Sequence, residues 1–423
     1  MTPFEVFTPT GIPTVTYVDR GGEHKLESQL TNALKTPGLT ISLSGPSKSG
    51  KTTLVKRVVS EDLLISVSGG AIKSAEMLWD RVLNWMEAPS ETSHSSSSKK
   101  SIELGAEAGG KAGFLGTGVE AKGSMAIKGE NEQGNERKYT RTGLDQVIKE
   151  IANSEFVVFI DDFHYMASEI QTDVARQCKE AAEKGIKICT ASVPHRADDV
   201  VRSNNELRGR VQAVDFDYWT PKEIAIIAHS GFDALNISIT QNTFDRLASE
   251  AFGSPQLMQQ ICLQFCFYYR ISASAAHALV IAPTIAELNA IFEQASTTTD
   301  FSSLLTALHA GPKPRGMERN KYAFADNSRG DVYRCVLLAL QQDPPKLGLS
   351  YDDIYQRSKS ICIGEGPTGS SLANALEQLD SIAKDIQPGQ PVLEWSEDVL
   401  DIVDPYFLYY MRCSPRLSRL GVA

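Results

Sequence analysis

The sequence predicts an α/β fold, in which a parallel sheet is followed by a helical region and a small C-terminal winged-helix-like domain. LTISLS (39–44) has the pattern of a strand and is followed by a glycine-rich turn and a helix. The apolar runs at 155–162 and 186–193 have the pattern of buried strands, and a helical segment separates them. Buried strands that alternate with helices indicate a parallel sheet covered on both faces. A turn, QPGQP, then precedes the strand-like VLEW near the C-terminus.

The length of 423 residues favours several domains, because one hydrophobic core rarely organises so long a chain. A polar and glycine-rich stretch at 90–140 interrupts the first domain. It is either a mobile surface excursion or one or two projecting β-hairpins that bind a partner. We expect an N-terminal arm at 1–38, an α/β core at 39–217, a helical lid at 218–295, a linker at 296–328 and the winged-helix-like domain at 329–423.

Composition limits the class of partner. The net charge of -10 argues against a surface that binds phosphate backbones as a whole. The seven cysteines include no CxxC pair, so we expect buried thiols in a reducing compartment. The most apolar long window contains Gln264, Arg270 and His277 and is better suited to a core helix than to a membrane span. With no signal-peptide pattern at the N-terminus, these features predict a cytoplasmic protein without a membrane partner.

GPSKSGKT (45–52) matches the phosphate-binding loop pattern G-x-x-x-x-G-K-[ST] between a strand and a helix. The glycines let the loop curl, so that backbone N–H groups and the helix N-terminus face phosphate oxygens. Lys51 would supply a cation for the β- and γ-phosphates, and the Thr52 hydroxyl would bind Mg²⁺. The predicted nucleotide-binding residues of this loop are Gly45, Pro46, Ser47, Lys48, Ser49, Gly50, Lys51, Thr52 and Thr53.

A second source of acid is needed to complete a Mg²⁺ site. Asp161 and Asp162 follow the apolar run FVVFI, at the end of a strand that is expected beside the loop. We expect Asp161 to hold Mg²⁺ together with Thr52, and Asp162 to orient or deprotonate the attacking water. The alternative is an ordinary solvated strand end.

Further catalytic candidates lie on the next strand and after it. Thr190 or Ser192 could contact the γ-phosphate and so sense its presence, or could serve only in core packing. Arg196, Arg208 and Arg210 form the most basic cluster of the core. An arginine that reaches a neighbouring subunit's nucleotide would stabilise charge in the transition state, with Arg208 and Arg210 as the candidates. A surface salt bridge is the alternative.

Taken together, these motifs resemble the AAA+/STAND group of P-loop ATPases. The resemblance rests on GPSKSGKT paired with FVVFIDD, on GSP (253–255) in a helical segment, and on a final winged helix that ends in VDPYFLYYMR. It implies that Gly253 and Pro255 touch the nucleotide, and that YVDR, with Tyr17 and Val18, lies on the adenine side. Two departures stand out: Asp162 occupies the place of the usual Glu, which suggests slow hydrolysis, and glutamines replace a sensor arginine after GSP.

Three functions compete: a signalling switch ATPase, as in bacterial conflict or phage-defence systems; an AAA+ ATPase acting in DNA replication or transposition; and a remodelling ATPase. Residues 329–413 carry 13 acids against 7 bases, and the expected recognition helix SSLANALEQLD has no Lys or Arg. This composition disfavours DNA binding. Remodelling ATPases need an exposed aromatic pore loop, for which the chain offers only Phe114 and Tyr139 in poor context. We therefore expect ATP and Mg²⁺ as cofactors, a homo-oligomer and a protein partner.

Overall fold

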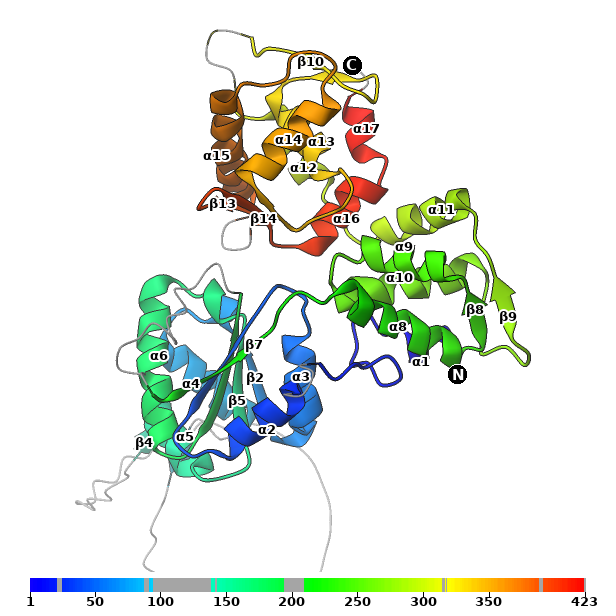
Figure 1. Ribbon diagram of the computed structural model, residues 1–423. Coiled ribbons are helices and arrows are strands. Elements are labelled where there is room, and N and C mark those ends of the chain that lie inside the picture. Colours follow the sequence, from blue (N-terminus) through cyan, green and yellow to red (C-terminus); the bar gives the residue numbers. More distant parts are fainter. Residues whose placement is uncertain are drawn as a thin grey trace, which may run out of the picture.

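The computed structural model describes residues 1–20, 25–86, 91–93, 138–140, 143–193, 209–313, 316, 318–387 and 391–421. They form three regions (Figure 1). The core contains the main sheet and its helices, the lid is a helical body beside it, and the C-terminal region lies above both.

The core is built on a five-stranded parallel sheet, as the sequence predicts. Its strand order is β2-β5-β6-β1-β7, so β6 lies between β1 and β5. The strands are β1 (Thr40–Ser44), β2 (Leu64–Ser68), β5 (Val157–Asp161), β6 (Lys187–Ser192) and β7 (Val211–Asp215). Because all five strands are parallel, their carboxyl ends meet along one edge, where the candidate site lies.

Successive side chains of each strand point to opposite faces of the sheet, and both faces are apolar. One face packs Ile65, Val158 and Ile188 against one set of helices, and the other packs Ile41 and Phe159 against a second set. The first set is α4 (Ala75–Trp85), α5 (Gly143–Ile151) and α6 (Ser168–Glu183), and the second is α2 (Leu26–Lys35) and α3 (Lys51–Val58). Both faces are therefore covered, as buried parallel strands require.

The stretch expected as an insertion lies mostly outside the described residues. Two short strands near its ends, β3 (Glu91–Ser93) and β4 (Lys138–Thr140), pair in antiparallel register. The choice between a surface excursion and a partner-binding hairpin stays open.

The lid is a helical body that includes the start of the chain. Phe7 packs on Phe232 with ring centroids 5.3 Å apart, and Gly231 makes room for it, because a Cβ there would lie 2.2 Å from the Phe7 ring. Residues 1–7 thus join the lid rather than a separate arm. The lid comprises α1 (Pro3–Val6), α8 (Pro221–Ala234), β8 (Ile237–Ile239), α9 (Gln241–Glu250), α10 (Pro255–Tyr268), β9 (Leu279–Ile281) and α11 (Ile285–Ser296).

The C-terminal region begins earlier than the sequence indicates. The segment expected as a linker contains α12 (Ser302–Ala310), whose Leu304, Leu305 and Leu308 are buried. This apolar stripe makes the segment part of the buried cluster of the C-terminal region, despite its flanking Thr, Ser, Pro and Gly. Further elements are β10 (Tyr322–Ala323), β11 (Arg329–Gly330), α13 (Val332–Leu340), β12 (Gly348–Ser350), α14 (Tyr351–Ile361), α15 (Gly369–Ile386), β13 (Leu393–Ser396), β14 (Val399–Ile402), α16 (Pro405–Cys413) and α17 (Arg416–Leu420).

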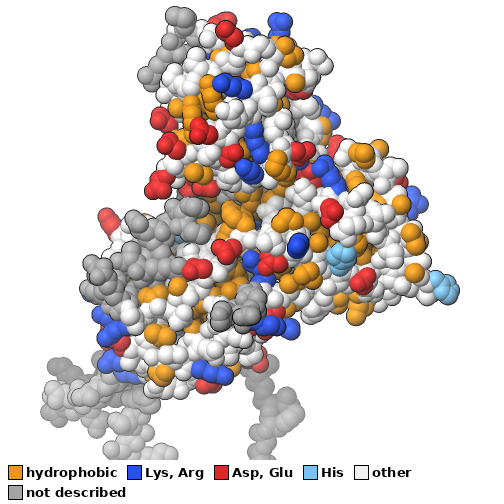
Figure 2. Space-filling view, in the orientation of Figure 1, with side chains coloured by type: hydrophobic (Ala, Val, Ile, Leu, Met, Phe, Trp, Pro, Cys, Tyr) orange, Lys and Arg blue, Asp and Glu red, His pale blue; other side chains and the backbone are white. Residues whose placement is uncertain are grey.

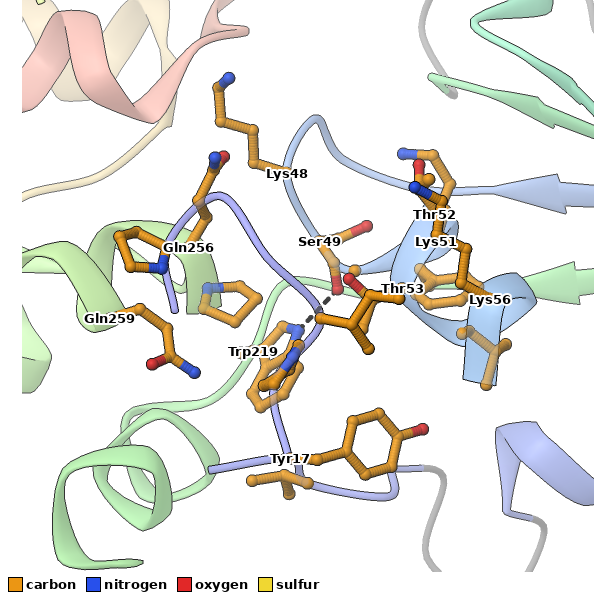
Figure 3. A pocket seen from close by; sticks show the side chains of 18 of the residues that line it. Tyr17, Lys48, Ser49, Lys51, Thr52, Thr53, Lys56, Trp219, Gln256 and Gln259 are labelled. Carbon is orange, nitrogen blue, oxygen red and sulfur yellow. Dashed lines mark hydrogen bonds between the residues drawn. The ribbon is translucent and has the colours of Figure 1, made fainter. Parts of the chain in front are cut away.

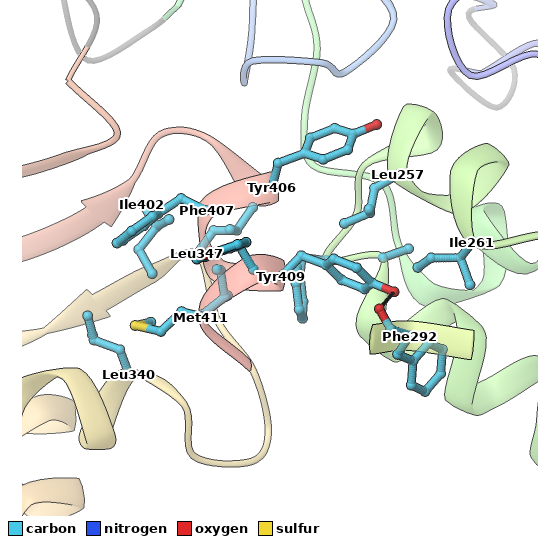
Figure 4. Close-up of a cluster of buried hydrophobic side chains, with 14 of the residues drawn as sticks. Leu257, Ile261, Phe292, Leu340, Leu347, Ile402, Tyr406, Phe407, Tyr409 and Met411 are labelled. Carbon is cyan, nitrogen blue, oxygen red and sulfur yellow. Dashed lines mark hydrogen bonds between the residues drawn. The ribbon is translucent and has the colours of Figure 1, made fainter. Parts of the chain in front are cut away.

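Helix α16 joins the C-terminal region to the lid. Its buried side chains continue the apolar cluster of both regions, and the Tyr409 hydroxyl donates to the backbone oxygen of Phe292 in α11 at 3.1 Å (Figure 4). Arg412 makes two bonds to Glu250 of α9, at 2.8 and 3.1 Å, with side-chain exposures of 8% and 1%. The lid and the C-terminal region therefore share one core and a buried ion pair.

We expect Arg412→Met to destabilise the protein, because it leaves the Glu250 carboxylate buried with, among the described residues, only the half-exposed Arg246 as a charge partner. Breaking a buried pair costs about 3–5 kcal/mol. The melting temperature should fall by several degrees in calorimetry, whereas Arg176→Met, which removes an exposed pair with Asp173, should leave it almost unchanged. Equal shifts of the melting temperature in the two variants would show that the Arg412–Glu250 pair does not stabilise the fold.

Candidate nucleotide-binding site

The loop 45–50 leaves β1 and enters α3 at the carboxyl edge of the sheet. Gly50, at the N-cap of α3, has φ 102°, which only glycine adopts readily. Gly45 lies against the residue after β7, because a Cβ there would be 2.3 Å from the Cβ of Phe216. Both glycines are thus required by the local backbone, which bends the loop toward the N-terminus of α3.

Lys51 is the buried cation of this loop. Its side chain is 9% exposed, and Nζ donates to the backbone oxygens of Gly45 (2.9 Å) and Pro46 (2.8 Å). Burial lowers the pKa of Lys51 to about 8, and the charges of Asp161 and Asp162 oppose that shift. The ammonium group therefore lies inside the loop, and a phosphate oxygen would replace carbonyl partners with a charged one.

Thr52 and Asp161 meet across the sheet edge. The Thr52 hydroxyl donates to Asp161 Oδ2 at 2.6 Å, although β6 separates β1 from the strand that carries Asp161. A hydroxyl and a carboxylate are hard oxygen ligands of the kind Mg²⁺ prefers. The residues predicted for the metal thus lie together and form a suitable pair of donors.

Asp162 turns out of the strand. It has φ 54°, and its backbone N–H donates to Asp161 Oδ1 at 3.0 Å. Gly69 accommodates this turn, because a Cβ there would lie 2.4 Å from the Asp162 backbone oxygen. Burial and the neighbouring Asp161 charge raise the pKa of Asp162, which makes it a better proton acceptor than an ordinary aspartate.

These groups line one end of a cleft of about 590 Å³ between the core and the lid (Figure 3). Trp219, after β7, forms part of its wall and donates from Nε1 to the Ser49 backbone oxygen at 2.9 Å. The Arg20 guanidinium lies 4.7 Å from the centre of the Trp219 ring and pairs with Glu223. Arg20 ends YVDR, the segment expected on the adenine side, whereas no pattern in the sequence singled out Trp219.

The other end of the cleft is formed by the chain start and by α10. Tyr17 and Val18, the residues predicted for the adenine side, line it, and the Arg57 guanidinium lies 5.0 Å from the centre of the Tyr17 ring. Pro255 also lines it, together with Gln256 and Gln259. Gly253 does not: it has φ 71° and approaches the backbone of Trp219, where a Cβ would lie 2.9 Å from the carbonyl oxygen. Gly253 thus forms a turn between α9 and α10, and its contact with a nucleotide stays a prediction.

The hydroxyl residues of β6 lie within the sheet. Thr190 is buried and donates to the Ile41 backbone oxygen at 3.3 Å, and Ser192 is 4% exposed. Val193, which follows them, lines the cleft. This arrangement fits the packing alternative for Thr190 better than a role as phosphate sensor.

The arginine candidates are only partly described. Arg196 and Arg208 lie outside the described residues. Arg210 precedes β7 and forms an ion pair with Glu183 at the end of α6, and its backbone oxygen accepts from Thr40 N at 2.8 Å. It lies at the amino ends of β1 and β7, opposite the phosphate-binding loop of the same chain. A role in a neighbouring subunit stays a prediction.

The sheet and its loop define a P-loop α/β domain. Among the described residues, no group of three or more His, Cys, Asp and Glu forms another metal site. Every described helix is too short or too polar to cross a bilayer.

No family model and no curated protein matches the sequence. Solved structures are similar at low identity. The Walker-type ATPase PABY2304 of Pyrococcus abyssi has 14% identity and a TM-score of 0.49, covering 93% of this chain and 96% of that chain. The ORC2 protein of Aeropyrum pernix has 10% identity and a TM-score of 0.47, covering 99% and 98%. Cdc6p from Pyrobaculum aerophilum has 13% identity and a TM-score of 0.42, covering 99% and 98%.

Proposed function

We propose that this chain is an AAA+-type P-loop ATPase that acts as a slow switch, coupling its nucleotide state to the C-terminal region and to a protein partner. The observation that carries the proposal is the Thr52–Asp161 contact beside the buried Lys51. A cation, a hydroxyl and a carboxylate at one sheet edge suit a Mg²⁺-bound triphosphate.

Each residue would have a separate task in hydrolysis. Lys51 and the N-terminus of α3 would hold the β- and γ-phosphates, and Thr52 and Asp161 would hold Mg²⁺, which neutralises phosphate charge when bound. Asp162 would orient or deprotonate the attacking water. Because an aspartate side chain is shorter than glutamate, we expect slow turnover, which suits a switch. The experiment is phosphate release from ATP in Mg²⁺, and complete inactivity at micromolar protein would contradict an ATPase.

The coupling is supported by a contact between the phosphate-binding loop and α16. Lys48 has φ 59°, and its ammonium group lies 5.2 Å from the centre of the Tyr406 ring. Asp404, which caps α16, is mostly buried; burial raises its pKa, and the Lys48 charge opposes the rise. In Figure 3 Lys48 extends away from Lys51 and Thr52. Because α16 also contacts the lid, a change in the conformation of the phosphate-binding loop would alter contacts in both the C-terminal region and the lid.

We expect Tyr406→Leu to loosen this coupling, because leucine keeps the apolar bulk but removes the aromatic face on which Lys48 lies. Such contacts are worth about 0.5–2 kcal/mol, so the rate of ADP release should rise about two- to thirtyfold. Stopped-flow release of a fluorescent ADP measures it, with Tyr355→Leu, which removes a similar contact with Lys359, as the control. If both variants release ADP at the parental rate, α16 does not restrain the loop.

The C-terminal region has the chain order helix, strand, helix, helix, strand, strand in α13, β12, α14, α15, β13 and β14, and we propose that it is a winged helix. On the face in view, acidic and basic side chains are interspersed over it (Figure 2). The excess of acids favours a protein contact over duplex DNA. The mass of the protein with ATP, followed with and without duplex DNA, tests this choice. A shift that requires DNA would favour replication or transposition.

Assembly into a homo-oligomer, with Arg208 or Arg210 acting on a neighbour's nucleotide, belongs to the same proposal. It is supported only by the charge and the position of these residues before β7.

A further inference from the structure

The cleft has a second end whose walls come from two distant parts of the chain. The segment 8–18 forms one wall, and Pro255, Gln256 and Gln259 of α10 form the other. In Figure 3 the two glutamines lie across the cleft from Lys51 and Thr52. If the phosphate-binding loop holds the triphosphate, the nucleoside of the same ligand would lie in this second end of the cleft.

Gln259 joins the two walls. Its Oε1 accepts from the Thr8 backbone N–H at 3.1 Å, and its Nε2 donates to the Thr16 hydroxyl at 2.6 Å. The Thr16 hydroxyl in turn donates to the Val6 backbone oxygen at 3.1 Å. Gln259 and Thr16 are 4% and 1% exposed, so this chain of bonds is shielded from water. The carbonyl oxygen and the amino group of the Gln259 amide are thus both hydrogen-bonded to segment 8–18.

The segment is anchored on either side of this bond. Before it, the packing of Phe7 on Phe232 fixes residues 1–7 to the lid. After it, Tyr17 passes to the core, where the Arg57 guanidinium lies over its ring. Residues 8–15 therefore bridge the rim of the cleft, and Gln259 is the hydrogen-bonding tie within that span.

We infer that Gln259 is a positioning residue, which holds segment 8–18 closed over the base and ribose of a bound nucleotide. The inference rests on the proposed nucleotide binding and assigns Gln259 to the nucleoside end alone. Helix α10 contains no Lys or Arg, and the Gln259 amide is committed to Thr8 and Thr16, so this helix supplies no cation to the phosphates. The contribution of Gln259 to binding should therefore be equal for ATP and ADP.

The test separates the two ends of the ligand. Affinities of the full chain for ATP, ADP and inorganic tripolyphosphate are measured by calorimetry. Gln259→Ala removes both bonds, and a lost buried bond corresponds to about a tenfold effect. We expect ATP and ADP to bind about tenfold more weakly, by the same factor, with tripolyphosphate affinity unchanged. An equal loss for tripolyphosphate, or no loss for ATP, would overturn the inference.

Matched variants exclude a general effect on folding. Gln264→Ala, on the same helix, removes an exposed bond to Gln294 and should leave all three affinities unchanged. Gln259→Glu keeps an acceptor for the Thr8 N–H but loses the donor to the Thr16 hydroxyl and buries a charge, so it should weaken ATP and ADP binding as Gln259→Ala does. Thr16→Val should weaken ATP binding. Combining it with Gln259→Ala should cause little further loss of affinity, because both substitutions break the same chain of hydrogen bonds. Full additivity would contradict a shared tie. If the parental protein binds neither ATP nor tripolyphosphate, the proposed function itself fails.

Discussion

Replacing Lys51 with alanine is expected to abolish detectable ATP binding. Lys51 is 9% exposed, and its ammonium group lies inside the loop and donates to two backbone oxygens, so the substitution removes the buried cation of the loop. Loss of a charge-assisted bond to phosphate removes about 1.5–3 kcal/mol per bond, and several bonds are lost together. Affinity should fall at least about a hundredfold, as measured by equilibrium dialysis.

The matched control for this variant is Lys35→Ala, which removes an exposed lysine in the last turn of α2. It should bind ATP as the parental protein does. Parental affinity in Lys51→Ala would mean that the loop does not hold phosphates.

Replacing Asp161 with alanine is expected to remove Mg²⁺-dependent hydrolysis. Asp161 Oδ2 accepts from the Thr52 hydroxyl at 2.6 Å, so the substitution deletes one candidate Mg²⁺ donor and leaves the other without its partner. Phosphate release should fall at least about a hundredfold, while ATP binding in EDTA should remain. Equal hydrolysis by Asp161→Ala and the parental protein would place the metal elsewhere.

Asp162→Asn separates the metal from the water-activating group. The turn with φ 54° tolerates asparagine, so the fold should be kept. ATP binding in Mg²⁺ should be unchanged and turnover slower. Turnover at the parental rate would show that another residue is the base.

The phosphate end of the site could be predicted from the sequence because its signals are local. The strand before Gly45, the helix after Gly50 and the glycines between them lie within twenty residues, and the structure forms these elements as expected. Asp161 was placed by the apolar run that precedes it. The parallel sheet followed from the alternation of buried strands and helices.

The other end of the cleft could be predicted only in part. Tyr17, Val18 and Pro255 were expected there from the resemblance, but the contacts that join its walls connect residues far apart in the chain. Gln259 and Thr16 are 243 positions apart, and Trp219 and Ser49 are 170 apart. The strand order, which puts β6 between β1 and β5, also has no local signal. Gly253 is a further example: the sequence marks it through the GSP motif, and the close approach of the Trp219 backbone is visible only in the structure.

The central claim is that Lys51, Thr52 and Asp161 grip the triphosphate of a nucleotide. Titration calorimetry of the purified full chain with ATP in Mg²⁺ tests it most directly. We expect saturable binding of one ATP per chain that disappears in Lys51→Ala. Absence of binding heat with both ATP and GTP, at several temperatures, would contradict it.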